Sequence, residues 1–170
     1  MRARRARPSD AGPIFELIAL YAKQGLLLPR AEDEIRRNID HFVVQEEMRR
    51  VVSCVALENY GADLTEIRSL AVDPELRGRG AGAKMLEFAL SEARRRGIAR
   101  IFAVTHAPEF FLRQGFESTS RQEFTEKIER DCRTCSKWRS CDLSAVVATV
   151  IPERIAFSIL PDSATPVSVA

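Results

Sequence analysis

Arg77-Gly78-Arg79-Gly80-Ala81-Gly82 is the stretch around which the rest of the chain is organised. It follows an apolar run at 64–72 and a turn at 73–75, and it precedes an amphipathic helix that the apolar spacing predicts for residues 83–96. A glycine-rich loop between a strand and a helix leaves backbone N–H groups free, and the helix dipole adds partial positive charge there. Glycine lets the backbone approach an anion closely, and the two arginines add charged donors. The stretch therefore predicts a site for a phosphate or a pyrophosphate.

The spacing of the glycines separates this loop from two better-known phosphate loops. No Lys-Ser or Lys-Thr pair follows at Walker A spacing, and the six residues do not form G-x-G-x-x-G. The pattern is Arg-x-x-Gly-x-Gly, and the alternative interpretation is a glycine-rich turn that only caps a helix. Two flanking stretches favour the anion site: Glu66-Ile67-Arg68-Ser69-Leu70-Ala71-Val72-Asp73-Pro74 and Phe110-Phe111-Leu112-Arg113-Gln114-Gly115-Phe116. Together the three motifs resemble the GNAT family, the Gcn5-related N-acetyltransferases, and the resemblance covers about residues 2–150.

The resemblance implies the fold class, which is α/β. It implies a single GNAT domain with a central mixed, mostly antiparallel sheet that is splayed between its fourth and fifth strands and flanked by helices. We expect the domain at 1–151 and a C-terminal tail at 152–170. The tail is rich in Pro, Ser, Thr and Ala after Pro161, so it has little to bury and is expected to be partly flexible.

Patterns along the chain agree with an alternation of strands and helices. The first helix is predicted to start at 8–10, where Ser9 or Asp10 can cap it, and to end at Gly25. Further helices are expected at 31–40, 83–96, 109–114 and 122–132. Strands are expected at 2–6, 42–46, 51–57, 64–72, 101–105, from 116 onward, and at 143–151.

Length and composition indicate one ordinary globular domain. The 170 residues can bury a core, and 45% hydrophobic with 29% charged residues is typical of globular chains. A net charge of +2 is too small to argue for nucleic acid, and no apolar run approaches the length of a membrane span. The Arg-rich start at 1–7 lacks an apolar signal core. We therefore expect a first strand with its arginines toward water, rather than a transit peptide, in a cytoplasmic protein.

The family resemblance implies acetyl-CoA as the cosubstrate. Its pantetheine arm would enter between the fourth and fifth strands and pair, like an added strand, with the backbone near Leu70 and Val72. Its diphosphate would lie on the glycine-rich loop. The residues expected to bind it are Leu70, Ala71, Val72, Arg77, Gly78, Arg79, Gly80, Ala81, Gly82, Ala83 and Phe111.

Three residues are candidates for the chemistry of acetyl transfer. The resemblance implies that the Leu70 N–H holds the oxyanion formed from the thioester carbonyl. Glu66 would act as the base, through water, for the attacking amine. Strand alternation predicts Glu66 on the same face as Arg68 and Leu70, and the alternative is a surface glutamate or an ion pair with Arg68. Thr105, at the end of the fifth strand, receives only a helping or positioning role.

The acid that would protonate the departing thiolate stays open. Many GNAT enzymes have a tyrosine four residues before the last glycine of the third motif, and this chain has Phe111 there. A thiol with a pKa of about 8.5 leaves without much help. His106 is a second candidate acid or base, whereas Phe110 and Phe111 suit the core or the wall of the cofactor site.

The stretches 25–30, 66–72 and 109–111 resemble, more narrowly, N-acetylglutamate synthases in their short, standalone bacterial form. This resemblance implies direct transfer, in a ternary complex, to the α-amine of L-glutamate, the first step of arginine synthesis. A dicarboxylic substrate needs fixed cations, and arginine binds a carboxylate through two hydrogen bonds. The candidate substrate-binding residues are Arg30, Arg68, Lys137 and Arg139.

Other functions stay open at this point. The acceptor in one alternative is glutamine, another amino acid or a protein N-terminus, and in another the chain is a non-catalytic CoA-binding module. The amino-acid-kinase-like domain that long synthases carry does not fit into this length. A homodimer is a further expectation.

The cysteines favour free thiols over a metal centre. Three of the four lie together late in the chain: Cys132, Cys135 and Cys141. A closed zinc site needs four ligands, and the fourth cysteine, Cys54, falls in a predicted buried strand. His41 or His106 would have to complete such a site. We therefore expect no metal, with a structural site on the three clustered cysteines as the alternative.

Overall fold

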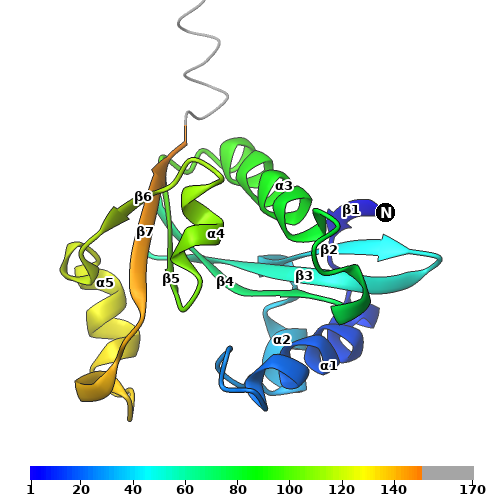
Figure 1. Ribbon diagram of the computed structural model, residues 1–170, viewed down its shortest axis with the longest axis horizontal. Helices are drawn as coiled ribbons and strands as arrows, with labels where there is room; N and C mark the ends of the chain where they lie inside the picture. The colour runs from blue at the N-terminus through cyan, green and yellow to red at the C-terminus, as the bar shows by residue number, and fades with distance from the viewer. Residues whose placement is uncertain (151–170) are drawn as a thin grey trace, which may run out of the picture.

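The computed structural model describes residues 1–150 (Figure 1). Ile151, the last residue of the predicted final strand, and the predicted tail lie outside the described residues. The strands are β1 (Arg2–Arg5), β2 (Phe42–Glu47), β3 (Arg50–Asn59), β4 (Leu64–Val72), β5 (Arg100–Thr105), β6 (Glu117–Thr119) and β7 (Ser144–Thr149). The helices are α1 (Ala11–Ala22), α2 (Glu32–Arg37), α3 (Ala81–Arg95), α4 (Pro108–Leu112) and α5 (Thr125–Lys127), and a π-helical turn (Ile128–Cys132) continues α5.

The seven strands form one sheet in the order β1-β2-β3-β4-β5-β7-β6. Within residues 1–150, β4 and β5 are the one parallel pair of neighbours. They pair only from Leu64 with Arg100 to Glu66 with Phe102, and then they separate. The predicted mixed, mostly antiparallel sheet that is splayed between its fourth and fifth strands is thus confirmed. The opening lies at the carboxyl ends of two parallel strands, where ligands of α/β sheets commonly bind.

Helices cover both faces of the sheet (Figure 1). Helices α3 and α4 lie on one face, here called the α3 face, and α1 and α2 lie on the other, the α1 face. Buried Met85 belongs to the core on the α3 face and buried Ile18 to the core on the α1 face. Phe102 of β5 points away from the α3 face, because its neighbours Ile101 and Ala103 pack there. The segment that contains α5 therefore packs on the α1 face.

An irregularity in β4 changes the predicted direction of one side chain. The register between β3 and β4 shifts between Cys54 and Ala56, and Ser69 has a left-handed φ of 53°. Leu70 consequently packs on the α3 face, whereas Arg68 lies opposite Ala56 on the α1 face. The prediction that Glu66, Arg68 and Leu70 share a face was therefore wrong for Leu70.

Element boundaries differ from the prediction in two instructive places. Helix α3 begins at Ala81 rather than Ala83, because Gly80 takes a left-handed φ of 78° and becomes the N-cap. The single helix predicted for 122–132 is instead a 3-10 turn (Arg121–Glu123), α5 and the π-helical turn. Within residues 1–150, no helix is both long and apolar enough to cross a membrane.

Candidate active site

The glycine-rich loop presents free backbone donors at the start of α3. The first hydrogen bond at this end runs from the Lys84 N–H to the Gly80 carbonyl at 3.0 Å. Within residues 1–150, the N–H groups of Ala81, Gly82 and Ala83 have no acceptor. These groups and the dipole of a 15-residue helix converge on one place, so the geometry suits an anion.

Tyr21 of α1 ties the loop to the end of β4. Its hydroxyl donates to the Val72 carbonyl and accepts from the Nε of Arg77 at 3.0 Å. The Arg77 guanidinium also lies over the Tyr21 ring, 4.7 Å from its centroid. Both Arg77 and Arg79 are exposed, but Arg77 is held beside the end of β4 by its contacts with Tyr21.

Phe110 rather than Phe111 borders the loop. A Cβ placed on Gly82 would lie 3.5 Å from the Phe110 ring and 3.7 Å from Val72, so these three residues meet at the start of α3. Phe111 is 5% exposed and packs edge-on against Phe110 and Phe116. The structure thus places Phe111, predicted as cofactor wall, in the core behind Phe110.

Thr105 and His106 follow the open end of β5. The Thr105 hydroxyl oxygen accepts from the Ala107 N–H at 3.0 Å, so it stabilises the turn into α4. His106 is exposed, and its Nδ1 lies 3.9 Å from a carboxylate oxygen of Asp142. Neither side chain contacts Glu66 within the described residues.

Glu66 lies at the last position where β4 and β5 pair, and it is 3% exposed. Its Oε2 accepts from the Lys127 Nζ at 2.7 Å and lies 2.9 Å from the Tyr60 hydroxyl oxygen. The Nε of Arg68 is 3.7 Å from the same oxygen. No hydrogen bond within residues 1–150 uses Oε1. Glu66 is therefore a buried, cation-paired carboxylate with one free oxygen, and not a surface glutamate.

Asp131, on the π-helical turn, extends this cluster. Its Oδ2 accepts from the Tyr60 hydroxyl, from the Nη1 of Arg68 at 3.3 Å and from the Lys127 Nζ at 3.5 Å. Burial alone would raise the pKa of Asp131, but Tyr60, Arg68 and Lys127 outweigh it and hold that pKa below its ordinary value. The cluster of Tyr60, Glu66, Arg68, Lys127 and Asp131 is called the Glu66 cluster below.

Arg30 carries a buried donor without a partner. Its side chain is 9% exposed, and its Nε and Nη2 donate to the Glu34 carboxylate. The guanidinium lies 5.2 Å from the centroid of Phe42. Its Nη1 is the one buried side-chain nitrogen or oxygen without a hydrogen-bond partner within residues 1–150. The hydrogen bonds from Arg30 also lower the pKa of Glu34, so that carboxylate stays ionised.

The four predicted substrate-binding cations fall into two groups. Arg30 and Arg68 lie on the α1 face, and both act on Glu34 electrostatically. Lys137 and Arg139 are exposed around the 3-10 turn Trp138–Ser140, and no ion pair joins either to another described residue. The structure therefore brings Arg30 and Arg68 to the Glu66 side of the sheet, and it leaves the other two outside the cluster.

Comparisons with known proteins agree with this architecture. The model of the acetyltransferase (GNAT) domain matches residues 37–118. An uncharacterised N-acetyltransferase of Chlorobaculum tepidum is 36% identical over 147 residues, which cover 86% of this chain and 95% of that protein. An amino-acid acetyltransferase of Mycobacterium tuberculosis is 35% identical over 135 residues, 77% of each chain. The chain belongs to the GNAT family of acetyltransferases.

The GNAT fold is also shared with solved structures. The N-acetylglutamate synthase of Neisseria gonorrhoeae, complexed with coenzyme A and N-acetyl-glutamate, superposes with a TM-score of 0.80 at 30% identity. The match covers 88% of this chain and 35% of that one, so the present chain spans about a third of that synthase. The coenzyme A bound there agrees with the predicted acetyl-CoA cosubstrate. This chain is an N-acetyltransferase of the GNAT type, related to amino-acid acetyltransferases.

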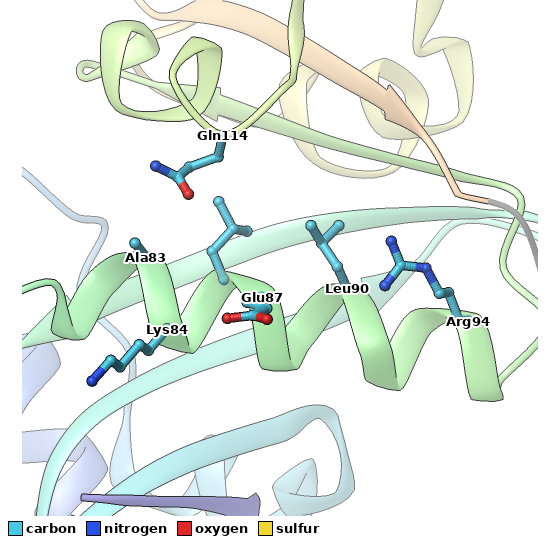
Figure 2. Close-up of a pocket in the computed structure, with 7 residues that line it drawn as sticks. Ala83, Lys84, Glu87, Leu90, Arg94 and Gln114 are labelled. Carbon is cyan, nitrogen blue, oxygen red and sulfur yellow. The ribbon is translucent and has the colours of Figure 1, made fainter.

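Two hollows of about 340 Å³ each mark the surface of this GNAT domain. Figure 2 shows the first, which runs along α3 from Ala83, beside the loop, to Arg94, with Gln114 opposite. Its charges are mixed, since Lys84 and Arg94 accompany Glu87. The second lies between α1 and the loop before α2, and it contains Arg30. Neither includes a member of the Glu66 cluster.

The three clustered cysteines lie in the segment that follows α5. Within residues 1–150, no group of three or more His, Cys, Asp or Glu side chains is arranged to hold a metal ion. The Cys135 N–H donates to the Cys132 carbonyl at 3.1 Å, which closes a turn between the two. Cys54 is buried in β3, and burial raises the pKa of its thiol to about 12.

Sequence reasoning missed four residues of this GNAT site: Tyr21, Tyr60, Lys127 and Asp131. The spacing of Tyr21 marks it only as part of the apolar stripe of the first helix. Lys127 and Asp131 fall four residues apart in a predicted helix, which a pair of opposite charges commonly stabilises, so their spacing gave no signal of a site. Only the packing of the α5 segment on β5 brings them to Glu66.

Proposed function

We propose that this GNAT enzyme transfers the acetyl group of acetyl-CoA directly to the α-amine of L-glutamate, in a ternary complex. The observation that supports this substrate is the buried, unpartnered Nη1 of Arg30, on the same face as Arg68. A buried guanidinium N–H without an acceptor is costly, and a substrate carboxylate would satisfy it. Two arginines on one face suit an amino acid with two carboxylates.

The cosubstrate occupies the mouth of the opening between β4 and β5. Its diphosphate accepts from the free N–H groups at 81–83, with Arg77 beside it. Its pantetheine arm extends along the edge of β4 that β5 leaves free, at Leu70 to Val72, and the Leu70 N–H holds the oxyanion. Phe110, with Phe111 behind it, forms the apolar wall at the start of α3. The catalytic domain comprises residues 1–151.

The reaction forms one C–N bond and breaks one C–S bond. The neutral amine attacks the thioester carbon, and the Oε1 of Glu66 takes the amine's proton through water. The tetrahedral intermediate collapses as CoA leaves as a thiolate, which needs little help from an acid. Thr105 shapes the turn after β5 and has no direct part in the chemistry.

The acceptor lies on the α1 face with its carboxylates toward Arg30 and Arg68. Both arginines have a protein partner, Glu34 and Asp131, so each offers its remaining donors to the substrate. Lys137 and Arg139 would reach the substrate only if the segment after α5 moved. Glutamine is the second candidate acceptor, because Glu34 and Asp131 already balance part of the positive charge.

The test follows free thiol released from acetyl-CoA by the purified protein with single amino acids. We expect release with L-glutamate, and a slower reaction with L-glutamine. Arg30→Ala should raise the KM for L-glutamate by about 10- to 100-fold, because a charged hydrogen bond is lost, with little change in the KM for acetyl-CoA. Arg36→Ala, an exposed arginine of α2 paired with Glu32, is the matched control. Absence of thiol release with millimolar L-glutamate would sink the proposal.

A further inference from the structure

We propose that Lys127 is a positioning residue for Glu66: its ammonium fixes one carboxylate oxygen so that the other meets the acceptor amine. The inference rests on the proposed function, in which Glu66 is the base. It makes the segment between β6 and β7 part of the active site, although the sequence pattern there indicates only a cysteine cluster and two cations.

Lys127 is built into the fold where it meets Glu66. Its side chain is 11% exposed, and its Nζ lies 2.7 Å from the Oε2 of Glu66. The ring of Phe124, three residues earlier, stacks on Phe102 of β5 with 3.9 Å between centroids. Phe102 is the β5 partner of Glu66 in the sheet. The stacking of Phe124 on Phe102 therefore holds α5 against the sheet and places Lys127 next to the Glu66 carboxylate.

A count of the hydrogen-bond donors in the cluster explains why a cation is needed there. The Tyr60 hydroxyl lies within hydrogen-bonding distance of both Glu66 and Asp131, but it has only one proton to donate. Burial and the charge of Glu66 raise the pKa of Tyr60, so the phenol stays neutral. Lys127 supplies three N–H donors and reaches both carboxylates, at 2.7 Å and 3.5 Å. Because the Tyr60 hydroxyl can donate to only one of the two carboxylates at a time, Lys127 supplies the hydrogen bond that the other carboxylate lacks.

The other charged groups around Glu66 do not replace Lys127. Glu58, its partner on β3, is a like charge that Arg130 neutralises at 3.0 Å, and the Nδ1 of His41 lies 3.2 Å from its carboxylate. Asp131 is a second like charge. Arg68 is 3.7 Å from Glu66 and is shared with Asp131. Lys127 is thus the nearest cation, and without it the ionised form of a buried carboxylate becomes less favourable.

Fixing Oε2 also determines where Oε1 lies. A carboxylate whose Oε2 accepts from Lys127 and lies 2.9 Å from the Tyr60 hydroxyl oxygen has little freedom to rotate, and a base held in one orientation reacts faster than a mobile one. Loss of Lys127 should therefore lower turnover even where Glu66 stays ionised. Binding of acetyl-CoA, which depends on the loop and the end of β4, should not change.

The experiment measures kcat and kcat/KM across pH for Lys127→Met, Lys127→Arg and the wild type, with L-glutamate and acetyl-CoA. Lys127→Met should lower kcat by about 10- to 100-fold, keep the KM for acetyl-CoA, and move the acid limb of kcat/KM to higher pH. Lys127→Arg should recover most of the activity and the wild-type acid limb. Arg133→Met, on the exposed side of the π-helical turn, is the control for changes in this segment.

The outcomes separate this inference from the proposed function. An unshifted acid limb in Lys127→Met, with activity reduced only in proportion to the folded fraction, overturns the inference and leaves the proposed function intact. If Lys127→Met does not fold, Lys127→Gln removes the ammonium charge but keeps a long polar side chain. A shifted limb and lower kcat in Lys127→Gln then support the anchoring, and a wild-type profile overturns it. If the wild-type enzyme acetylates no amino acid, both proposals fail.

Discussion

Two buried glutamates, Glu92 on α3 and Glu66 on β4, are paired with cations in different ways. Glu92 is fully buried, and both of its oxygens are occupied. Oε1 meets Arg5 at 2.7 Å and Arg96 at 2.9 Å, and Oε2 meets Arg95. Glu66 is nearly as buried, but all of its donors converge on Oε2.

The difference separates a structural carboxylate from one that is available for chemistry. The three arginines around Glu92 join β1 to the end of α3, and Arg96 also donates to the Asp40 carbonyl at 3.1 Å. Both carboxylate oxygens of Glu92 are thus used within the protein. Glu66 has its charge balanced at one oxygen, and no donor among residues 1–150 meets the other; the residue itself is the last at which β4 and β5 pair. The distinction predicts that changes at Glu92 alter stability and changes at Glu66 alter turnover.

Glu92→Gln should give the largest effect, a loss of about 3 kcal/mol in the free energy of unfolding, because three arginines lose a shared counter-ion. Urea unfolding followed by circular dichroism measures it. Glu87→Gln, on the exposed side of the same helix, is the control and should change stability by less than about 0.5 kcal/mol. Equal losses in the two variants would contradict the structural role.

Acid should remove the same stabilisation from the wild type. Burial opposes the ionisation of Glu92, but Arg95, Arg96 and Arg5 outweigh it and lower its pKa from 4.5 to about 2. Because the pKa is lower in the folded state, the stabilisation is complete above about pH 4.5 and disappears as the pH falls toward 2. Melting temperatures between pH 6 and pH 2 should therefore fall less steeply for Glu92→Gln. Parallel curves would show that Glu92 does not carry this acid sensitivity.

Glu66→Gln should lower kcat by about 100-fold near neutral pH, since the amine loses its base. The deficit should shrink at high pH, where more of the amine is already deprotonated. Initial rates of thiol release across pH measure it, with Glu92→Gln, assayed below its melting temperature, as the control with normal kcat. A deficit that is the same at every pH would remove Glu66 from the role of base.

Gly80→Ala tests the proposed anion site at the start of α3, and we expect a smaller effect than that of Glu66→Gln. Gly80 and Gly97 have similar left-handed φ values, 78° and 75°, and at both the space that a Cβ would fill is open. The same substitution at both costs similar backbone strain. Only Gly80→Ala should raise the KM for acetyl-CoA, by about tenfold, because it disturbs the free N–H groups at 81–83. Equal KM values in the two variants would contradict the anion site.

Tyr21→Phe should produce the smallest change. It removes the hydroxyl that joins Val72 to Arg77, so the KM for acetyl-CoA should rise about threefold, as expected for one hydrogen bond. The KM for L-glutamate should not change, because Tyr21 lies at the loop and not at the Glu66 cluster. Steady-state kinetics with each substrate varied in turn measures the two KM values separately, and a rise in the KM for L-glutamate alone would contradict the prediction.

The free backbone donors at the start of α3, to which we assign the cofactor, could be predicted because they are local. The glycine-rich stretch at 77–82 leads directly into them, and the strand and helix on either side follow from apolar spacing. The start of α3 was missed by two residues, since Gly80 acts as N-cap and not as part of a longer loop. The bulge at Ser69, which has no glycine or proline to signal it, reversed the predicted direction of Leu70.

The proposed acceptor end could be predicted only in part. Arg30, Arg68 and Glu66 were proposed from the sequence, and the structure places them on one face of the sheet, but their partners Glu34, Tyr60, Lys127 and Asp131 were not predicted. Lys127 is 61 residues from Glu66 along the chain, and Asp131 is 71 residues from Tyr60. No local pattern links residues at such separations.

The amino-acid sequence alone indicated the GNAT architecture, the glycine-rich loop with its free backbone donors and the presence of a glutamate on β4, because backbone donors and strand periodicity depend on neighbouring residues. Tertiary structure alone decided which oxygen of Glu66 is bound, which arginine keeps a buried donor without a partner, and that the segment after β6 reaches the site. These features depend on side chains brought together by packing on opposite parts of the sheet. The energies of these interactions come from burial and from charge pairing between residues far apart in the sequence, so they cannot be read from the local order of residues.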